Sequence, residues 1–286
     1  MKEYKLLTIL GHTAGGKTSL AAHTALMLDG EIISADSRQV YRGMDLGTGK
    51  DYGDYTVSGT DLPFHLIDIA DAGYEYSVFE FQRDFTRVFH QITDRGKIAV
   101  MCGGSGLYIE SILRKYRMIN VPVNQDLRED LSQKSMDELI NILKSYGSIH
   151  NTTDTASRKR AIRAIEIEKY QKEHEIIENE LPEFNSLVVG LKYERDERRS
   201  RITKRLHERL DEGMVDEVRA LMDSGIGASK LEYYGLEYKY LSQYVSGIIS
   251  YDQMVSQLNT AIHRFAKRQM TYFRGMERRG IKIHWL

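Results

Sequence analysis

The segment GHTAGGKT at residues 11–18 has the residue types and the spacing of a phosphate-binding loop. It matches the pattern G-x-x-x-x-G-K-[S/T] and stands between an apolar run and a helical run, the context that this pattern requires. Glycines let backbone N–H groups face phosphate oxygens, Lys17 adds positive charge, and the Thr18 hydroxyl can coordinate Mg²⁺. The predicted loop consists of Gly11, His12, Thr13, Ala14, Gly15, Gly16, Lys17 and Thr18. This P-loop predicts a bound oligophosphate and leaves the reaction open.

A second polar segment, ISADSRQ, follows another apolar run and contains Asp36. Ligands of a doubly wound parallel sheet bind at the carboxyl ends of its strands, so we expect Asp36 to lie near the phosphates. A carboxylate there can bind Mg²⁺ or accept a proton. Asp and Ser also cap helices, and that structural role is the alternative.

Two further segments could contribute polar groups to the same edge. GGSGLY at 103–108 places three glycines around Ser105, which suits close approach of the backbone to a ligand and offers a hydroxyl. Cys102 beside it is expected to be a small buried residue, because no histidine partner is evident. HLIDI at 65–69 is an apolar run with an acidic residue, Asp68, near its end. Asp68 could support a metal or have only a structural role.

These segments require a particular arrangement of elements. Short apolar runs that alternate with helical stretches predict βαβ units and a parallel sheet. The predicted strands are Lys5–Leu10, Glu31–Ser34, His65–Ile69, Ile98–Cys102, Leu187–Leu191 and Ile281–Trp285. We therefore predict an α/β fold, a P-loop NTPase-like parallel sheet flanked by helices.

The middle of the chain has a different pattern. Residues 123–180 have leucine and isoleucine at helical spacings, and Pro122 and Pro182 stand at either side. Proline favours the boundaries of elements. We predict a helical insertion domain at 120–185, helical throughout 123–180, and a core domain formed by 1–119 and 186–286.

The composition bounds the class of protein. The chain has 286 residues, 41% hydrophobic and 28% charged, with a single cysteine, so it can bury a core and forms no internal disulfide. No apolar run approaches the ~20 residues of a membrane span. We expect a cytoplasmic protein, a monomer, without a membrane partner.

The net charge is −1, but its distribution is uneven, since residues 256–286 carry seven Lys or Arg and one acidic residue. On a helix, five of the cations fall within about 120° of one another. These are Arg264, Lys267, Arg268, Arg274 and Arg278, with Ile262, Phe265, Ala266, Met270 and Phe273 opposite. We call the five cations the basic stripe. It is either a solvated face or a surface for an anionic partner.

Taken together, the motifs resemble the tRNA dimethylallyltransferases nearly end to end. The resemblance rests on GHTAGGKT, SADSRQVYRGMDLGTGK, HLIDI, GGSGLYI, RAIRAIE, RITKRL and AKRQMTYFR. It implies a P-loop core whose helical insertion grips the anticodon stem-loop of tRNA. The implied reaction moves a dimethylallyl group from dimethylallyl diphosphate to the exocyclic amine of the adenosine 3′ of the anticodon, with Mg²⁺ as cofactor and without ATP.

The resemblance also implies roles for residues. Asp36 matches the general base, Thr18 the Mg²⁺ ligand, and Thr13 to Lys17 the diphosphate cradle, while Ser105 stands where the family usually has threonine. Arg201 matches an arginine that reaches the diphosphate, with Arg205 as second choice. Matching tRNA-binding positions are Asp36, Ser37, Arg38, Gln39, Ser105, Arg128, Lys159, Arg160, Ala161, Ile162 and Arg163.

The chain departs from the family pattern at a few positions. Gly15 stands where serine is frequent, Asp51 where proline follows the lysine, Phe64 in place of a histidine, and Lys159 in place of a glutamine. These departures leave the chemistry intact and bear on RNA contacts. The alternatives are a prenyltransferase for free AMP or ATP, a P-loop kinase of a small metabolite, and a nucleotide-dependent RNA-binding switch without chemistry.

Overall fold

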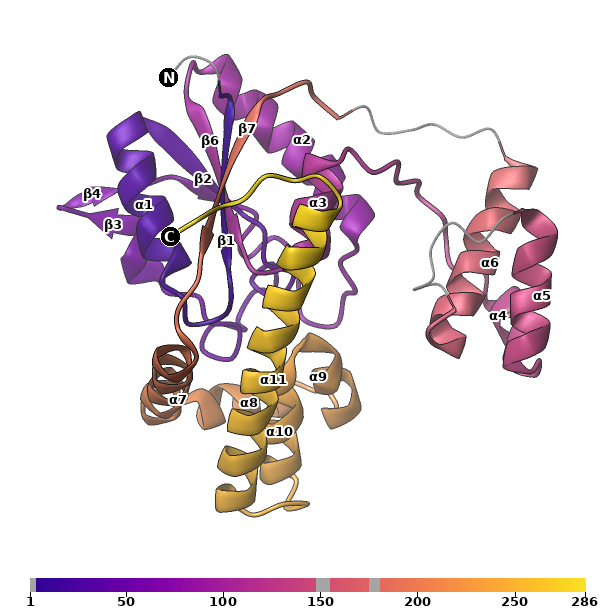
Figure 1. Cartoon of the computed structure of the whole chain (residues 1–286). Helices are drawn as coiled ribbons and strands as arrows, with labels where there is room; N and C mark the ends of the chain where they lie inside the picture. Colours follow the sequence, from indigo (N-terminus) through magenta and orange to yellow (C-terminus); the bar gives the residue numbers. More distant parts are fainter. Residues whose placement is uncertain (1–3, 148–154, 175–180) are drawn as a thin grey trace. The chain divides into compact units, whose positions relative to one another are not determined.

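The computed structural model describes residues 4–147, 155–174 and 181–286. The chain divides into two compact units, one formed by Met1–Tyr116 with Leu181–Leu286 and the other by Arg117–Glu180. The larger unit therefore contains both ends of the chain, and the smaller unit is inserted between its halves (Figure 1).

The larger unit is built on a six-stranded sheet with the order β5-β2-β6-β1-β7-β8, in which every pairing is parallel. The strands are β1 (Leu6–Gly11), β2 (Gly30–Ser34), β5 (Phe64–His65), β6 (Ile98–Gly103), β7 (Ser186–Leu191) and β8 (His284–Trp285). A separate hairpin pairs β3 (Thr56–Val57) with β4 (Thr60–Asp61). The central strands are buried on both faces, which is why their sequences are continuous apolar runs. The predicted α/β fold with a parallel sheet is confirmed.

Helices cover both faces of this sheet (Figure 1). Those on the faces are α1 (Lys17–Leu28), α2 (Val78–Asp94), α3 (Gly106–Leu113) and α11 (Tyr251–Arg278). Beyond the ends of the strands lie α7 (Arg195–Asp211), α8 (Met214–Asp223), α9 (Ala228–Tyr234) and α10 (Leu236–Val245). A 3-10 turn spans Tyr52–Tyr55. One core lies between the sheet and α2, α3 and α11, and a smaller one lies under α1. Ser77 begins α2 with a reciprocal capping box with Glu80, so a local signal sets this helix start.

Two predicted strands are shorter than expected. In HLIDI only Phe64–His65 forms a strand, because Leu66 and Asp68 have positive φ angles of 63° and 55°, which an extended strand does not allow. The C-terminal strand is limited to His284–Trp285. Neither predicted segment, 65–69 or 281–285, contains a glycine that would have indicated the shorter strand.

The smaller unit contains α4 (Gln125–Ser132), α5 (Met136–Tyr146) and α6 (Arg158–Glu173). These helices share a separate core with Leu131, Leu139, Leu143 and Ile165 at its centre. The predicted continuous helix over 123–180 is wrong at 123–124, 133–135, 147, 155–157 and 174 of the described residues. The described residues form three separate helices instead, and Ser135 starts α5 with its own capping box. Residues 148–154 and 175–180 lie outside the described residues. Within the described ranges, no helix is long and apolar enough to cross a membrane.

Candidate active site

A cavity of about 650 Å³ opens at the carboxyl ends of β1, β2 and β6, wholly within the larger unit. Each of these strands runs into a polar loop, so the topology brings three distant segments together. The loops contribute Thr13, Ala14, Lys17 and Thr18, then Asp36, Ser37, Arg38 and Gln39, then Gly104 and Ser105. The remaining walls come mainly from the segment 46–49 and from helices α7, α10 and α11. The structure thus brings these side chains together at one edge of the sheet, as the sequence predicted.

The P-loop has the backbone shape that its glycines predict. Ala14 and Gly16 have positive φ angles of 57° and 72°, and Gly16 is the N-cap of α1. Lys17 donates from Nζ to the backbone carbonyl of His12 at 2.8 Å, and burial lowers the pKa of Lys17. A Cβ at Gly15 would lie 2.9 Å from the same carbonyl oxygen, so this loop has no room for the serine that is frequent there. The helix start and Lys17 together make a preorganised anion site.

The side chain of His12 is fully buried, whereas Thr13, Ala14 and Thr18 of the same loop are partly exposed. Its Nδ1 lies 2.6 Å from the carbonyl oxygen of Thr13, and its ring packs edge-on against Tyr193. Burial lowers the pKa of His12 to about 4, so the ring is neutral near pH 7. Its backbone, rather than its ring, therefore serves the phosphate loop, through the bond to Lys17.

Asp36 and Ser105 lie on neighbouring loops of the cavity. Asp36 Oδ1 accepts from the backbone N–H of Arg38 at 3.0 Å, which closes a turn, and no helix begins there for Asp36 to cap. A carboxylate has several acceptor positions, which leaves capacity for a substrate proton. Ser105 Oγ accepts from the N–H of Ser37 at 2.9 Å and lies 3.1 Å from the Ser37 hydroxyl. Ser105 thus fastens its loop to the Asp36 loop.

The glycines around Ser105 have a different cause from the one expected. A Cβ at Gly103 would lie 2.2 Å from the carbonyl oxygen of Ala35, and one at Gly106 would lie 2.3 Å from the ring of Tyr272. The absence of a side chain at these glycines therefore lets the backbone of Ala35 and the ring of Tyr272 pack closely against them. The interpretation that these glycines make room for a ligand is not needed to explain them.

Arg201 and Arg205 occupy different environments. Arg201 Nε donates to the carbonyl of Ala14 in the P-loop at 3.3 Å, and its guanidinium stacks over the ring of Tyr193. Arg205 lines the cavity and pairs with Asp51 at 2.7 Å. Arg201 is thus held beside the phosphate loop, with Glu197 3.7 Å away, whereas Arg205 shares the carboxylate of Asp51 with Arg209.

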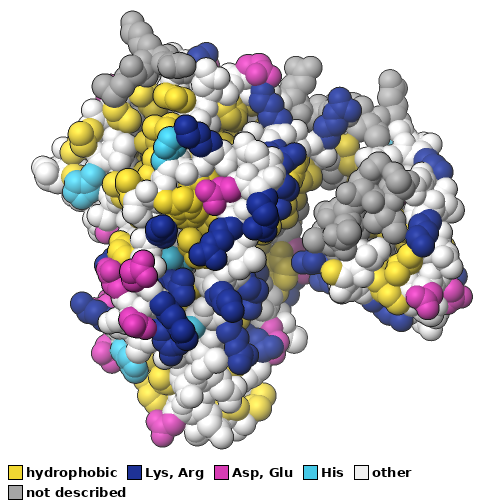
Figure 2. Space-filling model, in the orientation of Figure 1, with side chains coloured by type: hydrophobic (Ala, Val, Ile, Leu, Met, Phe, Trp, Pro, Cys, Tyr) yellow, Lys and Arg dark blue, Asp and Glu magenta, His cyan; other side chains and the backbone are white. Residues whose placement is uncertain are grey.

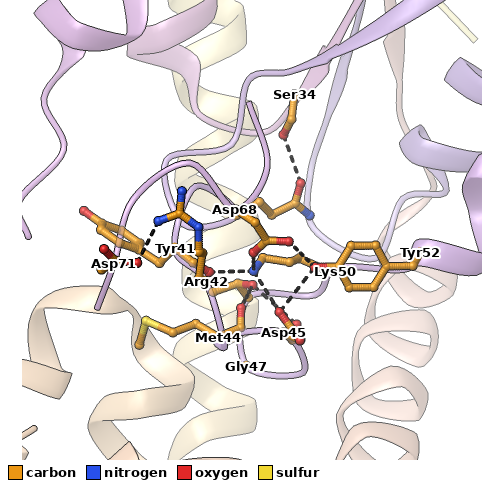
Figure 3. A network of polar contacts seen from close by, with 12 residues as sticks. Ser34, Tyr41, Arg42, Met44, Asp45, Gly47, Lys50, Tyr52, Asp68 and Asp71 are labelled. Atoms are coloured by element: carbon orange, nitrogen blue, oxygen red, sulfur yellow. Dashed lines mark hydrogen bonds and ion pairs between the residues drawn. The ribbon is translucent and has the colours of Figure 1, made fainter. Parts of the chain in front are cut away.

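The segment 44–50 contributes to one cavity wall, and hydrogen bonds and ion pairs from Lys50 hold it in place (Figure 3). Lys50, 4% exposed, donates to the carbonyl of Tyr41, to Asp45 at 2.8 Å and to Asp68. Asp68 therefore has the structural role among its two predicted alternatives. From α8, Glu217 accepts from the N–H groups of Asp45, Leu46 and Gly47 at 2.7–3.0 Å.

The predicted RNA contacts Arg38 and Gln39 also have partners in the protein. The Arg38 guanidinium lies over the ring of Tyr233, 5.2 Å from its centre. Gln39 donates to the carbonyl of Gly49 and accepts from Ser34, at 3.1 and 3.0 Å. Both residues still line the cavity.

Sequence reasoning missed several residues of the cavity wall, among them Glu237, Phe265 and Gln269. Glu237 on α10 is partly buried there, and desolvation by burial raises its pKa to about 7. Phe265 was expected on the apolar face of α11 but is 38% exposed, because its side of the helix turns toward the cavity. Gln269 joins two of the loops. All three belong to helices far along the chain. Glu237 and Phe265 lie outside the motifs, and Gln269 lies within AKRQMTYFR, where it was given no role.

In the smaller unit, the predicted tRNA-binding positions separate into two groups. Lys159 and Arg160 are exposed. Arg128 and Arg163 instead pair with the buried carboxylate of Glu166. The side chains of Ala161 and Ile162 lie in the core of the unit, which corrects their prediction as contact residues. They face inward because they share the apolar side of α6 with Ile165.

The cations of the basic stripe are all exposed, whereas Ile262, Ala266, Met270 and Phe273 on α11 are buried. Figure 2 shows Lys and Arg side chains gathered over the region of α7 and α11. Arg268 lines the cavity together with Phe265, so one residue of the basic stripe is part of the cavity wall.

Comparison with known proteins gives consistent matches. A family model described as IPP transferase matches residues 39–276. The chain is 58% identical over 286 residues to tRNA dimethylallyltransferase 2 of Bacteroides fragilis, covering 100% of this chain and 94% of that protein. It is 56% identical over 286 residues to tRNA dimethylallyltransferase 1 of Parabacteroides distasonis, covering 100% and 93%. The crystal structure of full-length tRNA isopentenylpyrophosphate transferase from Bacillus halodurans is similar with a TM-score of 0.71 and 31% identity, covering 99% of this chain and 90% of that one.

Proposed function

The chain belongs to the IPP transferase family, and on that premise we propose that it transfers a dimethylallyl group to tRNA. The donor is dimethylallyl diphosphate, and the acceptor is the exocyclic amine of the adenosine 3′ of the anticodon. The observation that carries the proposal is one cavity that holds both a phosphate loop with Lys17 and a carboxylate, Asp36. A kinase would not need the basic stripe on α11, and a binding switch without chemistry would leave that carboxylate idle.

The donor half of the site must stabilise a leaving diphosphate. Lys17 and the start of α1 present positive charge at the P-loop, and Arg201 is held beside it. These groups stabilise the negative charge that develops as the carbon–oxygen bond breaks. The apolar walls near Phe265 and Ile262 suit the prenyl chain.

Mg²⁺ fits the donor set of the P-loop. The Thr18 hydroxyl lines the cavity, and Mg²⁺ in phosphate sites takes few protein ligands besides substrate oxygens and water. Among the described residues no cluster of three acidic, His or Cys side chains could hold a metal alone, which agrees with a cation that arrives with the diphosphate. When bound, Mg²⁺ would neutralise phosphate charge.

The acceptor half must activate a poor nucleophile. The lone pair of an adenine amine is delocalised into its ring, and the base is stacked, so it must be turned out of the loop. We assign Asp36 as the base that takes a proton from the amine while the new nitrogen–carbon bond forms and pyrophosphate leaves. Ser105, bonded to the Asp36 loop through Ser37, offers its hydroxyl on the same side.

Structured RNA is favoured over a free nucleotide as acceptor. The basic stripe on α11 and the exposed Lys159 and Arg160 on α6 exceed what a mononucleotide requires, and unpaired loop bases are the ones most easily turned out. We further infer that the enzyme acts as a monomer in the cytoplasm.

A side-by-side assay tests the proposal. The protein is incubated with dimethylallyl diphosphate, Mg²⁺ and either an anticodon stem-loop RNA or AMP, and the products are weighed by mass spectrometry. We expect one five-carbon prenyl group on the RNA, at the adenosine 3′ of the anticodon, and little on AMP. Preferential prenylation of AMP, or RNA-stimulated ATP hydrolysis without prenyl transfer, would refute it.

A further inference from the structure

Gln269 on α11 is a polar side chain that is 7% exposed and sits between two loops of the active site. Its Oε1 accepts from the backbone N–H of Thr13 in the P-loop at 2.9 Å. Its Nε2 donates to the carbonyl oxygen of Gly104 at 3.0 Å. One amide group therefore spans two loops that are separated by about ninety residues of sequence but follow adjacent strands.

The contact is tight as well as polar. A Cβ at Gly104 would lie 2.5 Å from Nε2 of Gln269, a distance that real Cβ atoms do not occupy. Only glycine at 104 allows the amide to reach both loops. The loop that begins at Gly104 continues into Ser105, which is bonded to Ser37 next to Asp36. A continuous series of hydrogen bonds thus runs from the P-loop to the loop of the carboxylate.

We propose that Gln269 is a positioning residue, which sets the spacing between the diphosphate half of the site and its acceptor half. This inference rests on the proposed function. The two substrates react only when the carbon of one is in line with the nitrogen of the other, and a misplacement of ~1 Å can cost ~10²-fold in rate. Gln269 touches neither reacting atom and acts through Thr13 and Gly104.

The first test replaces Gln269 with methionine, which has nearly the same length and cannot make either bond. We expect kcat to fall about 10- to 100-fold with the KM for RNA changed less than about threefold, since the basic stripe is left intact. The matched control is Gln257→Met, the same change at an exposed position of the same helix, with kinetics of the parent. A Gln269→Met enzyme with parental kcat would overturn the inference.

A readout independent of turnover separates this inference from the proposed function. Exchange of the Thr13 amide hydrogen should be slow in the parent protein and faster in Gln269→Met. In Gln269→Glu the remaining acceptor should keep Thr13 protected, while loss of the donor to Gly104 still lowers kcat. If the parent protein does not prenylate RNA, the proposed function fails. If Thr13 exchanges equally in the parent and in Gln269→Met, the positioning role fails, whatever the reaction.

Discussion

The larger and the smaller unit differ in how they use their polar and charged side chains. In the larger unit, the loops that form the cavity are held by polar side chains from several elements, among them Lys50, Glu217 and Gln269. In the smaller unit, three helices share a modest apolar core, and cations such as Lys159 and Arg160 stand in solvent. The difference indicates that the chemistry depends on fixed geometry, while RNA attraction depends mainly on charge.

The largest effect expected within the larger unit comes from Asp36. Asp36→Asn keeps the shape and can still accept from the N–H of Arg38, but it loses the proton acceptor. We expect kcat to fall by ~10²–10⁴-fold with RNA affinity nearly unchanged, measured by single-turnover kinetics and by filter binding. Near-normal turnover would reduce Asp36 to the structural role of its bond to Arg38, which stabilises the turn at 37–40.

The P-loop should follow. Lys17→Ala and Thr18→Ala remove a cation and a metal-ligating hydroxyl, and each should lower the rate by at least ~10²-fold, the scale of a lost electrostatic stabiliser. Chelation of Mg²⁺ with EDTA should stop the parent enzyme, and added Mg²⁺ should restore it. Full activity in EDTA would contradict the assigned role of Thr18.

A smaller and different effect is expected in the smaller unit. The double variant Lys159→Glu, Arg160→Glu reverses two exposed charges, so the KM for RNA should rise roughly tenfold and the slope of affinity against salt should flatten. The KM for dimethylallyl diphosphate should not change. Arg163→Glu is the contrasting variant, because Arg163 pairs with buried Glu166, and its loss should lower stability. An equal rise in the KM for RNA and in the KM for dimethylallyl diphosphate would contradict the assignment of RNA attraction to the smaller unit.

The smallest effect concerns Glu237. Burial raises its pKa from 4.5 to about 7 in the folded protein, so the folded state loses stability as pH rises through that range. Glu237→Gln cannot ionise and should be more stable than the parent at pH 8. One pKa unit is worth about 1.36 kcal/mol, and since the side chain is only partly buried we expect about 1–2 kcal/mol. Urea unfolding should show no difference near pH 4.

The sequence predicts the central strands well because they are buried on both faces and leave an apolar run, as in β1 and β6. It fails for the segment after His65, where Leu66 and Asp68 adopt positive φ without a glycine. Backbone conformation of that kind depends on tertiary contacts, here the ion pair of Asp68 with Lys50.

The same limit applies to the active site. Local motifs marked the P-loop and the segments of Asp36 and Ser105, and these share one cavity. Glu237 and Gln269 come from helices whose placement no spacing encodes. Arg128 was expected to contact RNA because it matches a family position, and its ion pair with Glu166, 38 positions away, becomes visible only in the fold.

Cys102 has a practical consequence for probing the molecule. It is the single cysteine of the chain, and burial raises the pKa of its thiol to about 12. At pH 7.5 its reactive thiolate is then roughly 10⁴-fold scarcer than the thiol. Maleimide reagents should therefore pass over it and label cysteines engineered elsewhere. With one fluorophore placed in each unit, energy transfer could then report the distance between them in solution, in the free enzyme and with RNA.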